Sequence, residues 1–156
     1  MQPNFEALIP ELSRWNEGRG IDVAAWISCI GNFEHLIGYL ELIWPEFVEH
    51  EGCVLRAGFS AESFRGFMDH TGGNKRSVEA VINHVHIVRI FGDSDLSPTE
   101  GQVIHIGRKL KDIWTCKLAR DFPDREVTVS FPEGPFEDLT DFEITCFQSS
   151  HDHAAS

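Results

Sequence analysis

Basic residues are scarce in this sequence, and no long uninterrupted apolar run is present. There are 13 Lys and Arg against 25 Asp and Glu, which gives a net charge of −12 at pH 7. Because nucleic acids and anionic membranes are bound through basic surfaces, this balance argues against both as general partners. The most apolar stretches, residues 23–30 and 36–44, are much shorter than the about 20 apolar residues that span a bilayer. We therefore expect no membrane span and no nucleic-acid interface.

A basic start to the chain is also missing. A secretory signal begins with a positively charged segment followed by an apolar run, whereas no Lys or Arg precedes Arg14. This favours a cytoplasmic protein. The 156 residues fit one domain, and a hydrophobic share of 42% with 12 Phe and 4 Trp excludes disorder over most of the length.

Closely spaced cysteines are absent as well. Cys29, Cys53, Cys116 and Cys146 form no Cys-x-x-Cys motif, so neither a zinc knuckle nor a thioredoxin-like redox site has support. Each cysteine lies among apolar neighbours, and free cysteines are among the residues most often buried. We expect four buried, reduced thiols.

Helical periodicity dominates the first part of the chain. Apolar residues three and four positions apart predict helices over residues 4–16 and 22–43, which Pro10 and Gly31 are expected to interrupt. Residues 47–55 hold two short apolar pieces around a polar turn, and this pattern predicts a short hairpin.

Two further helices are predicted after the hairpin. Ser60 is the expected cap of a short helix that ends at Gly72 and Gly73. Residues 74–90 follow with a helical pattern, but their β-branched residues leave an extended end as the alternative.

The clearest local pattern is the start of a long helix. Ser97 is expected to be its N-cap, Pro98 its first residue, and Glu100 the residue that closes a capping box. This helix is predicted to run to about Asp121, because Pro123 stops it.

Two alternating segments predict strands near the C-terminus. Residues 126–131 and 141–147 alternate apolar and polar side chains, and their short connection indicates an antiparallel hairpin. The whole pattern predicts an α+β fold, with a mostly helical N-terminal two-thirds packed on a small antiparallel sheet that includes this hairpin. We expect one globular domain over residues 1–148 and a flexible polar tail over residues 149–156.

Histidines provide the candidate metal site. The densest group is His84 and His86, with Asp69 and His70 earlier in the chain. Residues two apart point in opposite directions on a helix and in the same direction on a strand. His84 and His86 are therefore metal candidates only if their segment is extended, and Asp69 and His70 are the further candidate ligands.

Signatures of enzymes are missing from the sequence. The turn over residues 71–76 places glycines before basic residues, but its spacing fits neither the phosphate-binding loop nor the dinucleotide fingerprint. A Gly-x-Ser-x-Gly nucleophile elbow is also absent. We therefore predict no catalytic residue and no cofactor, and we favour a role other than catalysis.

Charge is distributed unevenly along the chain. Residues 1–51 hold nine acidic and two basic residues, residues 52–120 hold seven and ten, and residues 121–156 hold nine and one. The C-terminal part, which contains the hairpin, thus has the largest excess of acidic over basic residues. Its candidate partner-binding residues are Glu133, Phe136, Glu137, Asp138, Asp141 and Glu143.

This acidic hairpin has two interpretations. Its charges solvate the sheet and deter pairing between sheet edges, or they form a negative patch that attracts a basic protein. Phe136 is either an apolar anchor within that patch or a residue folded back on the sheet. We expect a protein-interaction module, such as a regulatory or immunity-like protein that binds a basic partner. The alternative is a metal-binding protein or hydrolase built on the His and Asp cluster.

Overall fold

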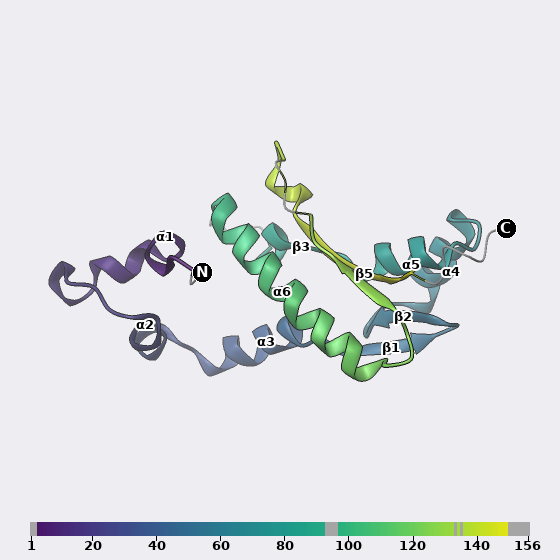
Figure 1. The fold of residues 1–156 in the computed structure, drawn as a ribbon, viewed down its shortest axis with the longest axis horizontal. Coiled ribbons are helices and arrows are strands. Elements are labelled where there is room, and N and C mark those ends of the chain that lie inside the picture. Colours follow the sequence, from purple (N-terminus) through teal and green to yellow (C-terminus); the bar gives the residue numbers. More distant parts are fainter. Residues whose placement is uncertain (1–2, 93–96, 133, 135, 150–156) are drawn as a thin grey trace. The chain divides into compact units, whose positions relative to one another are not determined.

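The structure is a computed structural model that describes residues 3–92, 97–132, 134 and 136–149. It has the expected α+β architecture, in which helices pack on small antiparallel sheets (Figure 1). The chain divides into two compact units, Met1–Leu42 and Ile43–Ser156.

The first unit is made of short helices. These are α1 (Phe5–Leu8), the 3-10 turns η1 (Pro10–Arg14) and η2 (Asn16–Gly18), α2 (Val23–Ile30) and most of α3 (Phe33–Ile43). Both expected interruptions are present, since Pro10 begins η1 and Gly31 ends α2 in an extended conformation. Among residues 3–42, Leu12 is the only buried residue.

The second unit begins with the predicted hairpin. Strand β1 (Phe47–His50) pairs antiparallel with β2 (Cys53–Arg56), and Phe47 lies opposite Arg56. Glu51 and Gly52 form the turn, with φ of 50° and 80°. Positive φ at both central residues is typical of the turns whose twist matches that of paired strands, and glycine suits the second position.

Two helices follow with side-chain caps. Ser60 caps α4 (Ala61–His70), as predicted, by accepting a hydrogen bond from Ser63 N–H at 3.0 Å. Asn74 caps α5 (Lys75–Ile82) in the same way.

The helix predicted over residues 74–90 is wrong in its second half. Helix α5 ends at Ile82, and the chain continues as β3 (Val85–His86) and the 3-10 turn η3 (Ile87–Arg89). Val85 pairs with Ile144, so strand pairing replaces helical hydrogen bonds in a segment rich in β-branched residues. The extended alternative is the one that the structure adopts.

Helix α6 (Glu100–Asp121) begins with a capping box, but not with the predicted one. Thr99 is the N-cap: its hydroxyl accepts from Gln102 N–H, and Gln102 Oε1 accepts from Thr99 N–H at 2.8 Å. The prediction with Ser97 and Glu100 is therefore displaced by two residues. Both frames have a hydroxyl followed three residues later by Glu or Gln, so the sequence pattern does not choose between them.

The C-terminal hairpin is confirmed. Strands β4 (Val127–Ser130) and β5 (Glu143–Gln148) pair antiparallel, with a 3-10 turn η4 (Leu139–Asp141) before β5. Strand β5 is central in a three-stranded sheet of order β3-β5-β4. Beyond β5, Ser149 N–H donates to Glu126 O at 3.0 Å, and residues 150–156 lie outside the described residues.

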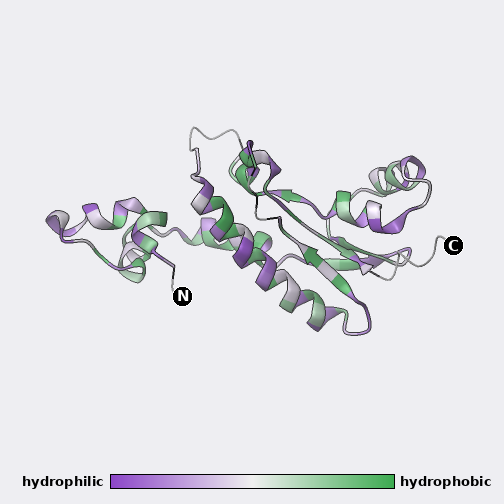
Figure 2. Ribbon diagram, turned by 45° about the horizontal axis from the view of Figure 1, so that its top comes forward, coloured by the Kyte–Doolittle hydropathy of each residue, from purple (hydrophilic) through white to green (hydrophobic). Residues whose placement is uncertain are grey.

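Helix α6 covers this sheet with its apolar face. Helix α6 carries both hydrophobic and hydrophilic residues along its length (Figure 2), and its residues Val103, Leu110, Trp114 and Leu118 are buried. The main core joins these residues to side chains from the sheet and from β1, among them Phe47, Val129, Phe131, Phe142 and Ile144. A smaller core under α4 and α5 contains Cys53, Leu55, Phe64 and Val78.

The prediction that all four cysteines are buried is correct for two of them and wrong for the other two. Cys53 and Cys146 are buried, whereas Cys29 and Cys116 are exposed on their helices. Desolvation, together with the nearby Glu79 carboxylate, raises the pKa of Cys53 to about 11 and also raises the pKa of Cys146. The two buried thiols are therefore protonated and unreactive at neutral pH.

The helices of the described residues are too short or too polar to cross a bilayer.

Candidate functional site

One group of side chains in the described part of the chain has the composition of a metal site. It consists of His84, His86 and Glu143, each of which offers one ligand atom within 4.8 Å of the others. The imidazole rings of His84 and His86 are 5.0 Å apart between centroids and nearly perpendicular. All three residues are partly buried.

The backbone explains why these residues meet. Helix α5 ends before His84, and strand β3 covers Val85 and His86, so neither histidine is helical. The two rings lie 5.0 Å apart between centroids and are therefore neighbours. His86 is the register partner of Glu143 across the β3–β5 pair, and the His86 Nδ1 atom lies 3.7 Å from Glu143 Oε2. The condition that this segment be extended and not helical is therefore met at His86, which lies in β3, while His84 directly precedes the strand.

Asp69 and His70 do not belong to this group. They lie exposed in the last turn of α4. Glu143, which the sequence assigned to the acidic hairpin surface, is the third member instead.

The other hairpin candidates have local roles of their own. Asp138 accepts hydrogen bonds from Thr140 N–H, which lowers the pKa of the Asp138 carboxyl and caps η4. The Phe136 ring packs edge-on against Phe142 at 5.0 Å between centroids and stays 37% exposed, so it folds back on the sheet in part. Glu137 and Asp141 are exposed, and Glu133 lies outside the described residues.

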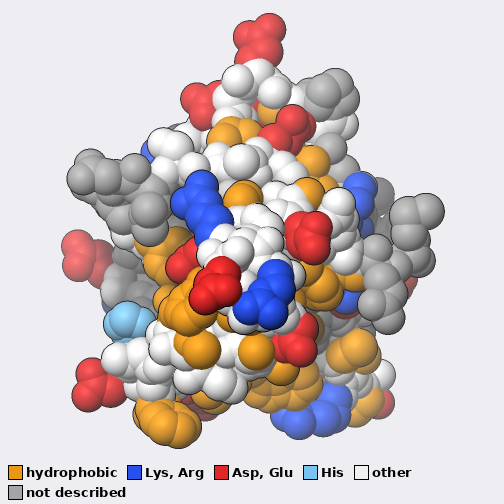
Figure 3. Space-filling view, turned by 90° about the vertical axis from the view of Figure 1, so that its left-hand side faces the viewer, with side chains coloured by type: hydrophobic (Ala, Val, Ile, Leu, Met, Phe, Trp, Pro, Cys, Tyr) orange, Lys and Arg blue, Asp and Glu red, His pale blue; other side chains and the backbone are white. Residues whose placement is uncertain are grey.

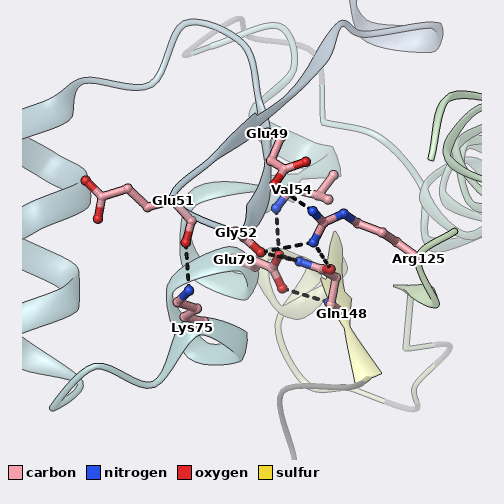
Figure 4. A network of polar contacts seen from close by, with 8 residues as sticks. All are labelled: Glu49, Glu51, Gly52, Val54, Lys75, Glu79, Arg125 and Gln148. Atoms are coloured by element: carbon pink, nitrogen blue, oxygen red, sulfur yellow. Dashed lines mark hydrogen bonds and ion pairs between the residues drawn. The ribbon is translucent and has the colours of Figure 1, made fainter. Parts of the chain in front are cut away.

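A buried polar network, absent from the sequence prediction, joins the two sheets (Figure 4). Glu79 on α5 is fully buried, and its carboxylate accepts from Val54 N–H and Gln148 N–H at 2.7 Å and from Gln148 Nε2 at 2.6 Å. Arg125 donates to Gln148 Oε1 at 3.0 Å and pairs with Glu49 at 2.6 Å.

Asn83, one turn after Glu79, extends this buried polar network. Its Oδ1 accepts from Arg56 N–H at 2.8 Å, and its Nδ2 donates to Val54 O and Cys146 O at 2.9 and 3.0 Å. The side chains of Glu79 on α5 and of Asn83, the C-cap of α5, thus take the hydrogen bonds that a strand between β2 and β5 would take. Because each of these groups satisfies backbone atoms, we assign the network to the fold and not to a reaction.

The helices α2 and α3 present uncovered apolar side chains. No residue of either helix is buried. Phe33, Leu36, Ile37 and Leu40 on α3 are 87%, 51%, 64% and 49% exposed. Their spacing of three, four and seven residues places them in one stripe along the helix.

This stripe, called the α3 stripe below, has acidic neighbours. Glu34 and Glu41 are seven residues apart on the same helix, and both are exposed. Figure 3 shows orange hydrophobic side chains at the molecular surface between red Asp and Glu and blue Lys and Arg. The helical periodicity of this segment was predicted from the sequence, but the exposure of its apolar side chains was not.

Comparison with known proteins adds no relative, because no protein-family model, no curated protein and no solved structure matches this chain.

Proposed function

We propose that this protein is a protein-interaction module that inserts the α3 stripe into an apolar groove of a basic partner protein. The observation that carries the proposal is the exposure of Phe33, Leu36, Ile37 and Leu40 along one face of α3. Contiguous exposed apolar surface of this kind marks interaction sites.

The spacing of the stripe fits a known mode of recognition. Amphipathic helices dock into hydrophobic grooves through anchors at positions i, i+3, i+4 and i+7. Phe33, Leu36, Ile37 and Leu40 occupy these four positions. Among the large hydrophobic residues that the structure describes, Phe33 has the largest exposed fraction. We therefore expect Phe33 to be the main anchor.

Charge supports a basic partner. Residues 1–42 hold six acidic residues and two basic ones, and Glu34 and Glu41 border the α3 stripe. A groove rimmed by Lys or Arg would complement these carboxylates and speed association. A second copy of this chain would instead bring like charges together, which disfavours a dimer through this face.

The acidic hairpin supports the same class of partner. Glu137 and Asp141 are exposed and available for long-range attraction. The substitutions Glu137→Lys and Asp141→Lys test this contribution without removing the Asp138 cap of η4. We expect slower association that depends less on salt concentration, as measured by stopped-flow mixing with the partner.

Affinity capture followed by reconstitution tests the proposal. The wild-type protein and the double variant Phe33→Asp/Ile37→Asp are used to capture proteins from the cells that express this chain. Phe91→Asp is the matched control, since Phe91 is 56% exposed but lies outside α3. A captured protein is then purified, and its Kd for each variant is measured by calorimetry.

The expected result is a basic protein that binds wild type and Phe91→Asp equally. Loss of two anchors should weaken binding at least about 30-fold, which corresponds to about 2 kcal/mol. The proposal is overturned if no purified binder depends on Phe33 and Ile37, or if the dependent binder is acidic. It is also overturned if sedimentation shows a dimer of this chain that the double variant dissociates.

A further inference from the structure

We propose that His84, His86 and Glu143 form a binding site for one Zn²⁺ ion. One ring nitrogen of each histidine and one carboxylate oxygen of Glu143 lie within 4.8 Å of one another. Imidazole nitrogen and carboxylate oxygen are ligands that zinc accepts, and two His with one Glu form a known catalytic zinc set.

Hydrogen bonds of the two histidines leave the required nitrogens available. His84 Nδ1 contacts Val81 O, and His86 Nδ1 contacts Thr140 O at 2.8 Å. A carbonyl oxygen only accepts, so each Nδ1 carries the proton and each Nε2 keeps its lone pair. Metal-binding histidines usually donate their second nitrogen to a carbonyl or carboxylate in this way, which fixes the ring orientation.

The pairing of β3 with β5 places Glu143, the third ligand, beside His86. His86 and Glu143 are register partners of β3 and β5, so the backbone holds their side chains side by side. Tetrahedral ligands about 2.0–2.2 Å from zinc are about 3.3–3.6 Å apart. The His86 nitrogen that lies 3.7 Å from Glu143 Oε2 is Nδ1, so coordination through His86 Nε2 requires the partly exposed Glu143 side chain to rotate toward that atom.

The ligand types select among metals. Ca²⁺ and Mg²⁺ prefer sites made only of oxygen ligands, whereas imidazole favours zinc and its neighbours in the first transition row. Three protein ligands leave one position of a tetrahedral zinc ion for water or another molecule. The site also links β3, β5 and, through Thr140, the turn η4, so binding should stabilise this corner of the sheet.

Zinc titration of the full-length protein tests the site. Stoichiometry and Kd are measured by calorimetry for wild type and for His84→Gln, His86→Gln and Glu143→Gln. The double variant Asp69→Asn/His70→Gln is the matched control, since its residues are exposed on α4. Every protein is also measured with His151→Asn/His153→Asn, which removes two histidines near the C-terminus as a source of stray binding.

We expect one equivalent of zinc, and at least about 10-fold weaker binding in each ligand variant. The control variants should bind like wild type, and excess Mg²⁺ should not compete. Zinc at about 100 times Kd should raise the Tm by roughly 5 °C or more in wild type but not in the ligand variants.

A measurement on the wild-type protein covers the case in which a ligand variant fails to fold. Imidazole ¹⁵N spectra should show the Nε2 signals of two histidines shifting on zinc addition while their Nδ1 atoms stay protonated. The proposal is overturned if zinc does not bind, if its Kd is unchanged in the folded ligand variants, or if only the His151 and His153 substitutions remove it. Shifts of Nδ1 instead of Nε2 would also overturn the proposed ligand atoms.

Discussion

At the scale of single residues, close packing decides where glycine is needed. Gly107 lies in the buried face of α6, and a methyl group added there would overlap the ring of Phe131. At Gly101, in the first turn of the same helix, the nearest side-chain atom of the described residues to an added methyl group is the Thr99 hydroxyl, at 4.0 Å. The same substitution at these two sites should therefore have opposite effects.

We predict that Gly107→Ala lowers the free energy of unfolding by about 1–3 kcal/mol, because Phe131 must move in a packed core. Gly101→Ala should raise it by about 0.5–1 kcal/mol, because alanine favours the helix and restricts the unfolded chain. Urea denaturation measures both. In a double-mutant cycle, Phe131→Leu should relieve part of the Gly107→Ala loss, and strict additivity would contradict the predicted contact.

At the scale of elements, side chains of α5 connect strands that do not pair. The buried Glu79 carboxylate accepts hydrogen bonds from β2 and from β5, which belong to different sheets. Sequence periodicity identified the apolar residues of α5, such as Val78 and Ile82, but not the connection that Glu79 makes between β2 and β5. A lone Glu within a helical pattern is normally exposed, so the pattern alone gives no reason to bury it.

We predict that Glu79→Ala lowers the free energy of unfolding by at least about 3 kcal/mol, because it leaves three buried donors without this acceptor. Glu79→Gln keeps one acceptor oxygen and should lose less, about 1–3 kcal/mol. The control Glu62→Ala removes an exposed carboxylate from the first turn of α4, and should change stability by less than about 1 kcal/mol. Urea denaturation of all three variants checks this order. Equal stabilities of Glu79→Ala and Glu62→Ala would show that the connection between the two sheets does not depend on the Glu79 carboxylate.

At the scale of the whole molecule, the buried side chains are unevenly divided. Both hydrophobic cores draw their buried residues from the second unit, whereas Leu12 is the only buried residue among residues 3–42. Burial of apolar surface is the main favourable term in folding. The second unit therefore holds most of the stabilising contacts of the described chain.

We predict that residues 43–156 fold without residues 1–42. Their urea transition, followed by the fluorescence of Trp44 and Trp114, should be cooperative and close to that of the full chain. In hydrogen exchange of the full chain, amides of residues 3–42 should exchange faster than those of the core strands. A shortened chain that does not fold would instead support the single domain predicted over residues 1–148.

The sequence alone determined the class of fold and the position of most elements, because periodicity, caps and turns act over a few residues. The hairpins, the long helix and the interruptions at Pro10 and Gly31 follow from such local patterns. Tertiary structure decided which distant residues meet, since strand pairing places Glu143 beside His86 and ends the helix of residues 74–90 early. It also decided that the α3 stripe is exposed, because an amphipathic pattern shows which face is apolar but not what covers it.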